Sequence, residues 1–168
     1  LQDIYGIAGV IDAAYAYGEF DNKDGRRRAL VVAERVGSFI LNGEIYPGEV
    51  YGHDYARIPV ILEDGLNRVL VKVGGAGDHE FTFRLIPAPS PLMVITKDAT
   101  LPDLLRGKPF KGWAGVSVLN TTSKTVRGAV LSAEGPAFEH TERVVENLPP
   151  LSVVKVPIMV ETRGGIEE

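Results

Sequence analysis

Short clusters of apolar and β-branched residues recur along the whole chain, punctuated by Gly, Pro, Asn and Asp. No long window carries a convincing apolar period of 3.6 residues, which an amphipathic helix would require. The pattern therefore predicts an all-β fold. It places strands near Ala14–Phe20, Arg28–Glu34, Ser38–Leu41, Ala56–Leu62, Arg68–Val73, Glu80–Ile86, Leu92–Thr96, Ala114–Asn120, Val126–Ala133, Glu139–Val145 and Ser152–Val160.

Three connections carry recognisable turn chemistry. The segments Asn22–Gly25 and Glu63–Gly65 both end in glycine, which can take the positive φ that tight hairpin turns often need. The dipeptide Asn42-Gly43 is suited to a type I′ turn between two strands. Strands at this spacing, joined by such turns, favour sandwiches or barrels over α/β folds.

Two segments fit the strand pattern less directly. Leu101–Leu105 follows Thr100 and precedes Gly107, so it could form one short helical turn. At the start of the chain, Ile4, Ile7, Val10 and Ile11 suit either a strand or a short helix, and we favour a strand. Neither segment changes the expected fold class.

The boundary between two domains is indicated by the proline-rich segment Pro87–Pro91. Three prolines in five residues remove backbone donors and restrict φ, which suits a connector better than a central strand. A second irregular stretch, Lys97–Lys111, lies close behind it. We therefore expect a sandwich over residues 1–91 and a second one over residues 92–168.

Composition narrows the classes of function. The chain has 168 residues and a net charge of −4, so no long-range field favours nucleic acid or an anionic membrane. It has no cysteine, which excludes disulfides, thiolate metal sites and a cysteine nucleophile. No apolar run approaches the roughly 18–20 residues of a membrane-spanning helix. The basic run Arg26–Arg28 fits a charged hairpin shoulder better than a phosphate-binding patch.

The ends of the sequence suggest a processed or truncated product. Leu1–Val10 lacks an initiator Met and the basic region of a signal peptide, and the chain ends in Glu167-Glu168.

Residues 13–86 present a set of β motifs in a characteristic order. An aromatic strand at Ala14–Phe20 is followed by the apolar Leu30–Val32 and by the Leu-Asn-Gly-Glu motif of Leu41–Glu44. Further along come Ile58–Leu62 and the Gly-x-Asn-x-x-Leu-Val-Lys-Val motif of Gly65–Val73. This order resembles the galactose-binding-like jelly-roll domain that accompanies many glycosidases and other secreted hydrolases.

Residues 112–162 resemble immunoglobulin-like β-sandwich modules found beside such domains. The similarity lies in Val116–Thr122, Val126–Leu131 and Leu148–Pro157. The pair of domains resembles the non-catalytic amino-terminal part of secreted hydrolases with a prolyl-oligopeptidase-like or esterase catalytic domain. This resemblance implies a secreted or periplasmic accessory or scaffolding region. Its partner would be a catalytic hydrolase domain or another copy of the chain.

A catalytic site is not evident in the sequence. The Ser elbow of an α/β-hydrolase reads Gly-x-Ser-x-Gly, whereas Gly115–Leu119 lacks the second glycine and continues as a strand. There is no His-Glu-x-x-His zinc motif. We therefore expect the chain alone to catalyse nothing. The rival interpretation is a compact hydrolase that assembles a site from distant residues such as Ser38, His53 and Asp54.

One loop carries the residue types of a carbohydrate site. Aromatic rings pack against the C–H faces of sugars, and charged side chains bond their hydroxyl groups. The alternative is a long loop whose tyrosines pack on the sandwich edge, and both interpretations stay open. The candidate ligand-binding residues, which would make the chain a carbohydrate-binding module, are Tyr46, Tyr51, His53, Asp54, Tyr55 and Arg57.

A calcium site is the one metal centre that the resemblance suggests, since structural calcium recurs in galactose-binding-like domains. Asp21, Asn22 and Asp24 could supply part of an oxygen cage, although a plain turn fits them better. No other cofactor is expected. Trp113 begins a strand and is expected to anchor a core or a domain boundary.

Overall fold

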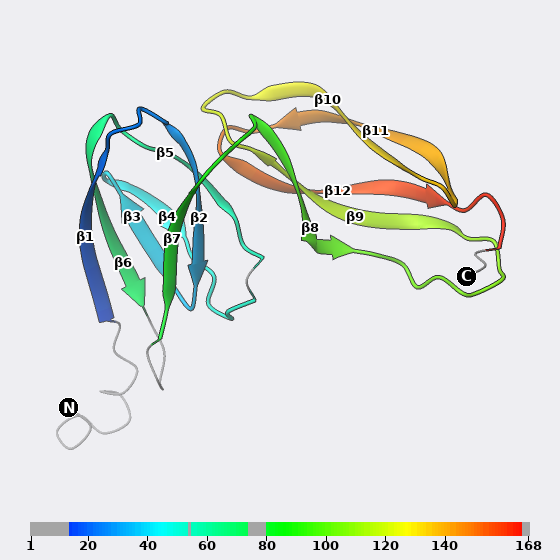
Figure 1. Cartoon of the computed structure of the whole chain (residues 1–168), viewed down its shortest axis with the longest axis horizontal. Coiled ribbons are helices and arrows are strands. Elements are labelled where there is room, and N and C mark those ends of the chain that lie inside the picture. Colours follow the sequence, from blue (N-terminus) through cyan, green and yellow to red (C-terminus); the bar gives the residue numbers. More distant parts are fainter. Residues whose placement is uncertain (1–13, 54, 74–79, 166–168) are drawn as a thin grey trace, which may run out of the picture. The chain divides into compact units, whose positions relative to one another are not determined.

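The computed structural model describes residues 14–53, 55–73 and 80–165 (Figure 1). The chain divides into two compact units, Leu1–Pro89 and Ser90–Glu168, each of which is considered by itself. The strand expected near Ile4–Ile11 lies outside the described residues. All regular structure in the described ranges is β-strand, so the all-β prediction is confirmed.

The first unit contains two antiparallel sheets. One has the strand order β1-β6-β3-β4 and the other the order β5-β2-β7. The strands are β1 (Ala14–Asn22), β2 (Arg28–Glu34), β3 (Ser38–Leu41), β4 (Glu44–Pro47), β5 (Ile58–Ile61), β6 (Gly65–Val73) and β7 (Thr82–Pro87).

The two sheets of the first unit face each other through a common core. Alternate residues of β6, namely Val69, Val71 and Val73, are buried as their spacing predicts. The ring of Phe39 on β3 meets Phe83 on β7 edge to face, with 5.1 Å between the ring centroids. The buried core cluster consists of Ala29, Val31, Ala33, Val36, Phe39, Leu41, Val60, Leu62, Val69, Val71 and Val73.

The sequence predicts the first strand and the turn of the β3–β4 hairpin, but not its second strand. Asn42 and Gly43 have φ values of 51° and 90°, the two positive values that a type I′ turn requires. The second strand of the hairpin, β4, is short and exposes Glu44 and Ile45, so it lacks the apolar cluster by which the other strands were predicted. The turn chemistry is therefore the signal that identifies this strand.

The second unit contains five strands in two sheets. A hairpin of β10 and β11 forms one sheet, and the order β12-β9-β8 forms the other. Only four residues make up its buried core cluster, Val118, Val145, Leu148 and Val156. The strands are β8 (Leu92–Thr100), β9 (Lys111–Asn120), β10 (Val126–Gly135), β11 (Phe138–Leu148) and β12 (Ser152–Glu161).

Polar contacts join the two sheets of the second unit along one side. A single β-bridge pairs Phe138 with Thr162, and the hydroxyl of Thr141 on β11 donates to the carbonyl of Met159 on β12 at 2.6 Å. The five strands therefore follow the spatial order β10-β11-β12-β9-β8. On the other side, between β8 and β10, apolar side chains line a groove of about 170 Å³; they include Leu92, Val94, Ala129, Val130 and Leu131.

The structure corrects two expectations about side-chain packing and local structure in the second unit. Leu101–Leu105 forms no helix; its leucines at 101, 104 and 105 are exposed, and so short a helix needs tertiary packing to persist. Trp113 lies on β9 but is 57% exposed, so it does not anchor the core of this unit, and its expected role at a domain boundary stays a prediction.

Within the described ranges no helix is long and apolar enough to cross a membrane.

Candidate functional site

The loop between β4 and β5, predicted as the ligand-binding loop, is tied down at its start. The backbone N–H of Gly48 donates to the carbonyl of Gly37 at 3.2 Å, and the N–H of Val36 donates to the carbonyl of Glu49 at 2.9 Å. A Cβ atom on Gly48 would lie 1.9 Å from the Val36 carbonyl oxygen, so only glycine fits there. The loop therefore starts from a fixed point beside the β2–β3 connection.

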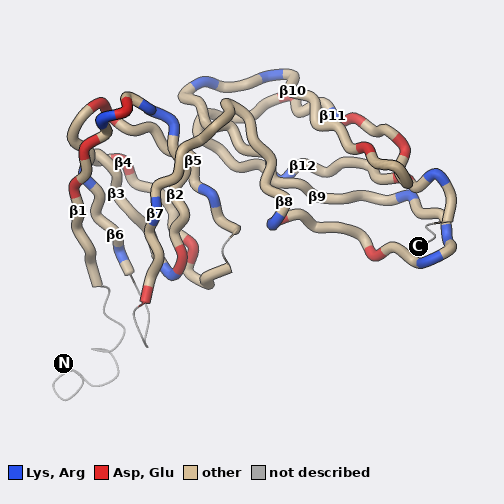
Figure 2. Tube along the Cα trace, viewed as in Figure 1, with Lys and Arg blue, Asp and Glu red and all other residues tan. Residues whose placement is uncertain are grey.

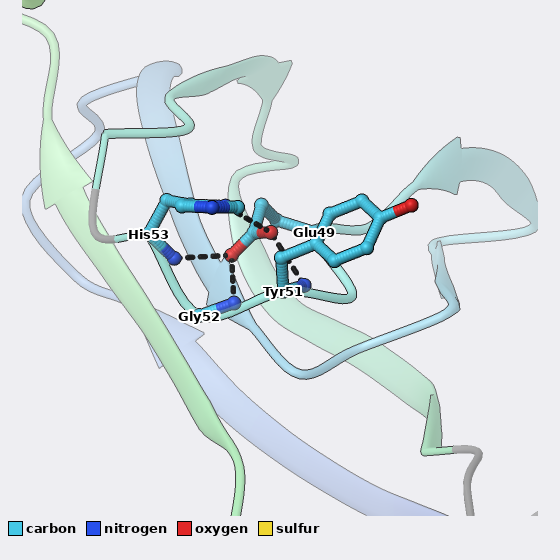
Figure 3. A network of polar contacts seen from close by, with 4 residues as sticks. All are labelled: Glu49, Tyr51, Gly52 and His53. Atoms are coloured by element: carbon cyan, nitrogen blue, oxygen red, sulfur yellow. Dashed lines mark hydrogen bonds and ion pairs between the residues drawn. The ribbon is translucent and has the colours of Figure 1, made fainter.

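Glu49 organises the residues that follow it (Figure 3). Its carboxylate accepts hydrogen bonds from the backbone N–H groups of Tyr51 at 2.6 Å, Gly52 at 2.6 Å and His53 at 2.9 Å. The Nδ1 atom of His53 lies 3.3 Å from the same carboxylate. Gly52 takes a φ of 75°, which lets the chain curl around the acid. One acidic side chain thus holds the turn closed.

The protonation of Glu49 follows from these contacts. Burial raises the pKa of the carboxyl, but the hydrogen bonds from His53, Tyr51 and Gly52 outweigh it and hold the pKa below its usual value. Glu49 is therefore ionised near neutral pH and is suited to holding the loop. A general acid would need the opposite shift.

Three rings of the predicted site form a series beside this turn. The rings of Tyr51 and His53 lie 5.5 Å apart at 55°, and those of His53 and Tyr55 lie 5.3 Å apart at 28°. Tyr51, at the end of the series, is 78% exposed. The loop therefore brings three of the six predicted residues together, with one ring open to solvent.

Two other predicted ligand residues, Tyr46 and Arg57, make different contacts. Tyr46 stacks on Phe39, with ring centroids 5.0 Å apart and an interplanar angle of 10°, and belongs to the packing around the core. Burial is the main cause that raises the pKa of its hydroxyl. Arg57 donates to the adjacent carbonyl of Ala56 at 2.9 Å. Asp54 lies outside the described residues.

A cavity of about 520 Å³ borders this loop. Gly52 lines it, together with the end of β2 and the start of β7. Arg35 takes a φ of 56°, an uncommon left-handed conformation that places its side chain against Gly52. The sequence did not indicate these residues, because isolated charges at strand ends are ordinary surface features; the lining also includes Glu34, Glu80, Phe81 and Thr82.

Of the residues in the rival hydrolase interpretation, Ser38 and His53 lie in the described part of the chain, whereas Asp54 does not. His53 Nδ1 lies against Glu49, and no hydrogen bond joins His53 to Ser38 among the described residues. Ser38 pairs through its backbone with Pro47 and Lys72 at the start of β3.

A different serine does contact a carboxylate. Ser117 on β9, which is 2% exposed, donates its hydroxyl to Asp98 at 2.5 Å, and Lys155 lies 3.2 Å from the same acid. The hydrogen bond from Ser117, aided by Lys155, lowers the pKa of Asp98. A carboxylate with a lowered pKa is a weak base, so Ser117 is not activated. The three side chains instead anchor β8 where its pairing with β9 shifts register.

The proposed calcium ligands lie in the β1–β2 turn. The amide nitrogen of Asn22 donates to the carbonyls of Arg26 at 3.2 Å and Glu63 at 3.0 Å, so this side chain ties the turn to the β5–β6 connection. Across the ranges that the structure covers, no three His, Cys, Asp or Glu side chains are grouped to hold a metal ion. These two hydrogen bonds give the Asn22 side chain a structural role that needs no metal. Calcium binding by Asp21, Asn22 and Asp24 stays a prediction.

Comparison with known proteins yields structural similarity only. No protein-family model and no curated protein matches the sequence. Among solved structures, the exo-chitosanase CsxA of Amycolatopsis orientalis matches at 13% identity and a TM-score of 0.48, over 92% of this chain and 21% of that chain. The same enzyme with a glucosamine-configured castanospermine matches at 12% identity and a TM-score of 0.45, over 92% and 22%. This chain thus spans about a fifth of that protein's length.

Proposed function

We propose that this chain is a non-catalytic accessory region of a larger secreted hydrolase and that it docks onto the polypeptide of a catalytic domain. The observation that carries the proposal is the open side of the second unit, where the groove between β8 and β10 is lined by apolar residues. In this proposal residues 1–91, which include the whole first unit, are of the galactose-binding-like type. Residues 92–168, which make up nearly all of the second unit, are of the immunoglobulin-like type.

The chemistry of the open side favours a polypeptide as the partner. β8 stands at the end of the sheet order β12-β9-β8, and β10 pairs only with β11 among the described strands. Each therefore has an edge with backbone N–H and C=O groups that a further strand would satisfy. Val94 on β8 and Val130 on β10 are 46% and 57% exposed, which gives the incoming strand apolar surface to bury.

The proposal is tested by blocking this side. The chain would be mixed with the catalytic domain of its parent hydrolase, expressed separately, and the dissociation constant measured by calorimetry. We expect Val94→Lys and Val130→Lys each to weaken the complex about tenfold or more, because a lysine there opposes strand pairing. Val50→Lys, at a similarly exposed valine of the first unit, is the matched control. Equal affinities for all variants would overturn the docking surface.

The non-catalytic part of the proposal has its own test. The purified chain would be incubated with a broad set of ester and peptide substrates. We expect no turnover, because Ser117 donates to an acid that is a poor base and His53 is held against Glu49. Turnover that Ser38→Ala or Ser117→Ala abolishes would contradict this part and favour the compact hydrolase.

A second candidate function is carbohydrate binding at the β4–β5 loop. The exposed ring of Tyr51 beside the cavity lined by Gly52 supports it, since such rings can stack on sugars. A glycan array would identify a ligand, and Tyr51→Ala and Asp54→Ala would then be titrated against it. Tyr15→Ala, which removes a similarly exposed ring on β1, is the control. If a glycan binds and the first two variants keep full affinity, its site lies elsewhere.

A further inference from the structure

Three consecutive arginines line one cavity in the first unit. The cavity measures about 510 Å³, and Arg26, Arg27 and Arg28 contribute to its wall together with Gly25 and the segment Pro87–Pro89. Figure 2 shows the arginines as a basic stretch of chain between β1 and β2. The sequence favoured a charged hairpin shoulder for this run, and the cavity is what the tertiary structure adds to it.

The backbone of the arginines is fixed in place. The carbonyl of Arg27 accepts the N–H of Leu62 at 2.7 Å, and the carbonyl of Arg28 accepts the N–H of Ala88 at 3.3 Å. Arg28 is also the first residue of β2, where it pairs with Ile61. The backbones of Arg27 and Arg28 are thus anchored from two neighbouring segments, which fixes where their side chains leave the main chain.

The arginines of the cavity lack ion-pair partners within the described residues. No ion pair there includes Arg26, Arg27 or Arg28, and the side chain of Arg27 donates only to the carbonyl of Leu62, at 3.4 Å. Asp24 lines an adjoining cavity together with Arg26 and Arg28, without an ion pair to either. Three neighbouring cations repel one another, so an anion among them relieves an unfavourable interaction.

The apolar part of the cavity lining favours an anion that carries an organic group. Pro87, Ala88 and Pro89 give one side of the cavity an apolar, conformationally rigid surface. Guanidinium groups bind phosphate, sulfate and carboxylate through paired hydrogen bonds. The volume falls within the range of about 300–1,000 Å³ that holds small-molecule ligands.

We propose that this cavity binds a small organic oxyanion, such as a sugar that carries a phosphate, sulfate or carboxylate group. The guanidinium groups hold the oxyanion, and the proline side covers the body of the ligand. The lining of this cavity shares no residue with the β8–β10 groove or with the ring series of the β4–β5 loop, so the inference does not depend on the proposed function.

Calorimetric titration of the whole chain tests the proposal. The probes are glucose 6-phosphate, glucose 6-sulfate and glucuronate, with glucose and inorganic phosphate as references. We expect at least one charged sugar to bind more tightly than both references. We also expect its affinity to fall several-fold when salt rises from about 50 to about 200 mM, because the contacts are ionic. The rank order of the three sugars identifies which oxyanion the site prefers.

Two variants locate the site. Arg26→Gln, in an exposed turn, and Arg28→Gln are each expected to weaken binding about tenfold, as for a lost charge-assisted hydrogen bond. Arg143→Gln, at an exposed arginine of β11, is the matched control and should keep full affinity. Circular dichroism would verify folding, and Arg26→Gln alone suffices if Arg28→Gln fails to fold.

Three results would overturn the proposal. They are no binding by any charged sugar at millimolar concentration, glucose or inorganic phosphate binding as tightly as the best charged sugar, and unchanged affinity in a folded Arg26→Gln or Arg28→Gln chain.

Discussion

At the scale of single residues, the side chain of Asn67 makes four hydrogen bonds within the first unit. It is fully buried; its amide oxygen accepts from the backbone N–H of Glu63 at 2.9 Å, and its amide nitrogen donates to the carbonyls of Glu63 at 3.0 Å and Gly65 at 2.9 Å. A fourth bond, from the amide of Asn42 at 2.8 Å, joins the β3–β4 turn to β6. One side chain thus satisfies the backbone of the turn before β6.

We therefore predict that Asn67→Ala lowers the free energy of unfolding by about 2–4 kcal/mol, because it leaves buried backbone groups without partners. Urea denaturation followed by circular dichroism measures this. Asn147→Ala, at an exposed asparagine of β11, should change stability by less than about 0.5 kcal/mol. Equal losses in the two variants would show that the Asn67 bonds contribute nothing specific.

Glu49 carries a pH-dependent contribution to stability. Because the pKa of its carboxyl is lower in the folded chain than in the unfolded chain, the stabilisation is complete above the unfolded value of about 4.3 and is lost as pH falls through the folded value. We predict that Glu49→Gln costs about 1–2 kcal/mol at pH 7 and progressively less below about pH 4. Urea denaturation across pH measures the difference, with the exposed Glu44→Gln as control. A cost independent of pH would contradict this account.

At the scale of structural elements, the contact between the β4–β5 loop and the β2–β3 connection depends on Gly48. Its position leaves no room for a Cβ atom beside the Val36 carbonyl. We predict that Gly48→Ala destabilises the chain by about 2 kcal/mol or more and speeds hydrogen exchange at Val36 and in residues 48–53. Gly164→Ala, where a Cβ would meet nothing within 4 Å, is the matched control. Unchanged exchange in the loop would mean that the contact does not hold it.

At the scale of the whole molecule, the two units differ in how much apolar surface they bury. The core cluster of the first unit has eleven buried residues, including Phe39, whereas that of the second has four. Since burial of apolar side chains is the main source of stability, we predict that the second unit opens at lower urea than the first. Hydrogen exchange at increasing urea measures the two openings separately. Simultaneous opening of β2 and β9 at all concentrations would contradict independent units.

Much of this β-fold follows from local sequence patterns and can be predicted without the tertiary structure. The alternation in Gly65–Val73 fixes which residues of β6 are buried, because successive side chains of a strand point to opposite faces. The Asn42-Gly43 dipeptide specifies its turn through the positive φ values that few other residues tolerate. The same local logic located eleven of the twelve described strands, whereas β4 is too short and too exposed for its apolar pattern to show.

The candidate sites were decided by the tertiary structure. The loop composition indicated the rings of Tyr51, His53 and Tyr55, but only the fold shows that Tyr46 instead packs on Phe39. The sequence pattern assigned no role to Glu49, because its three hydrogen bonds to backbone N–H groups form only when the turn is closed. The arginine cavity likewise joins Arg26–Arg28 to Pro87–Pro89, about sixty residues further along the chain. Strand and turn depend on neighbouring residues, whereas a site depends on segments that only packing brings together.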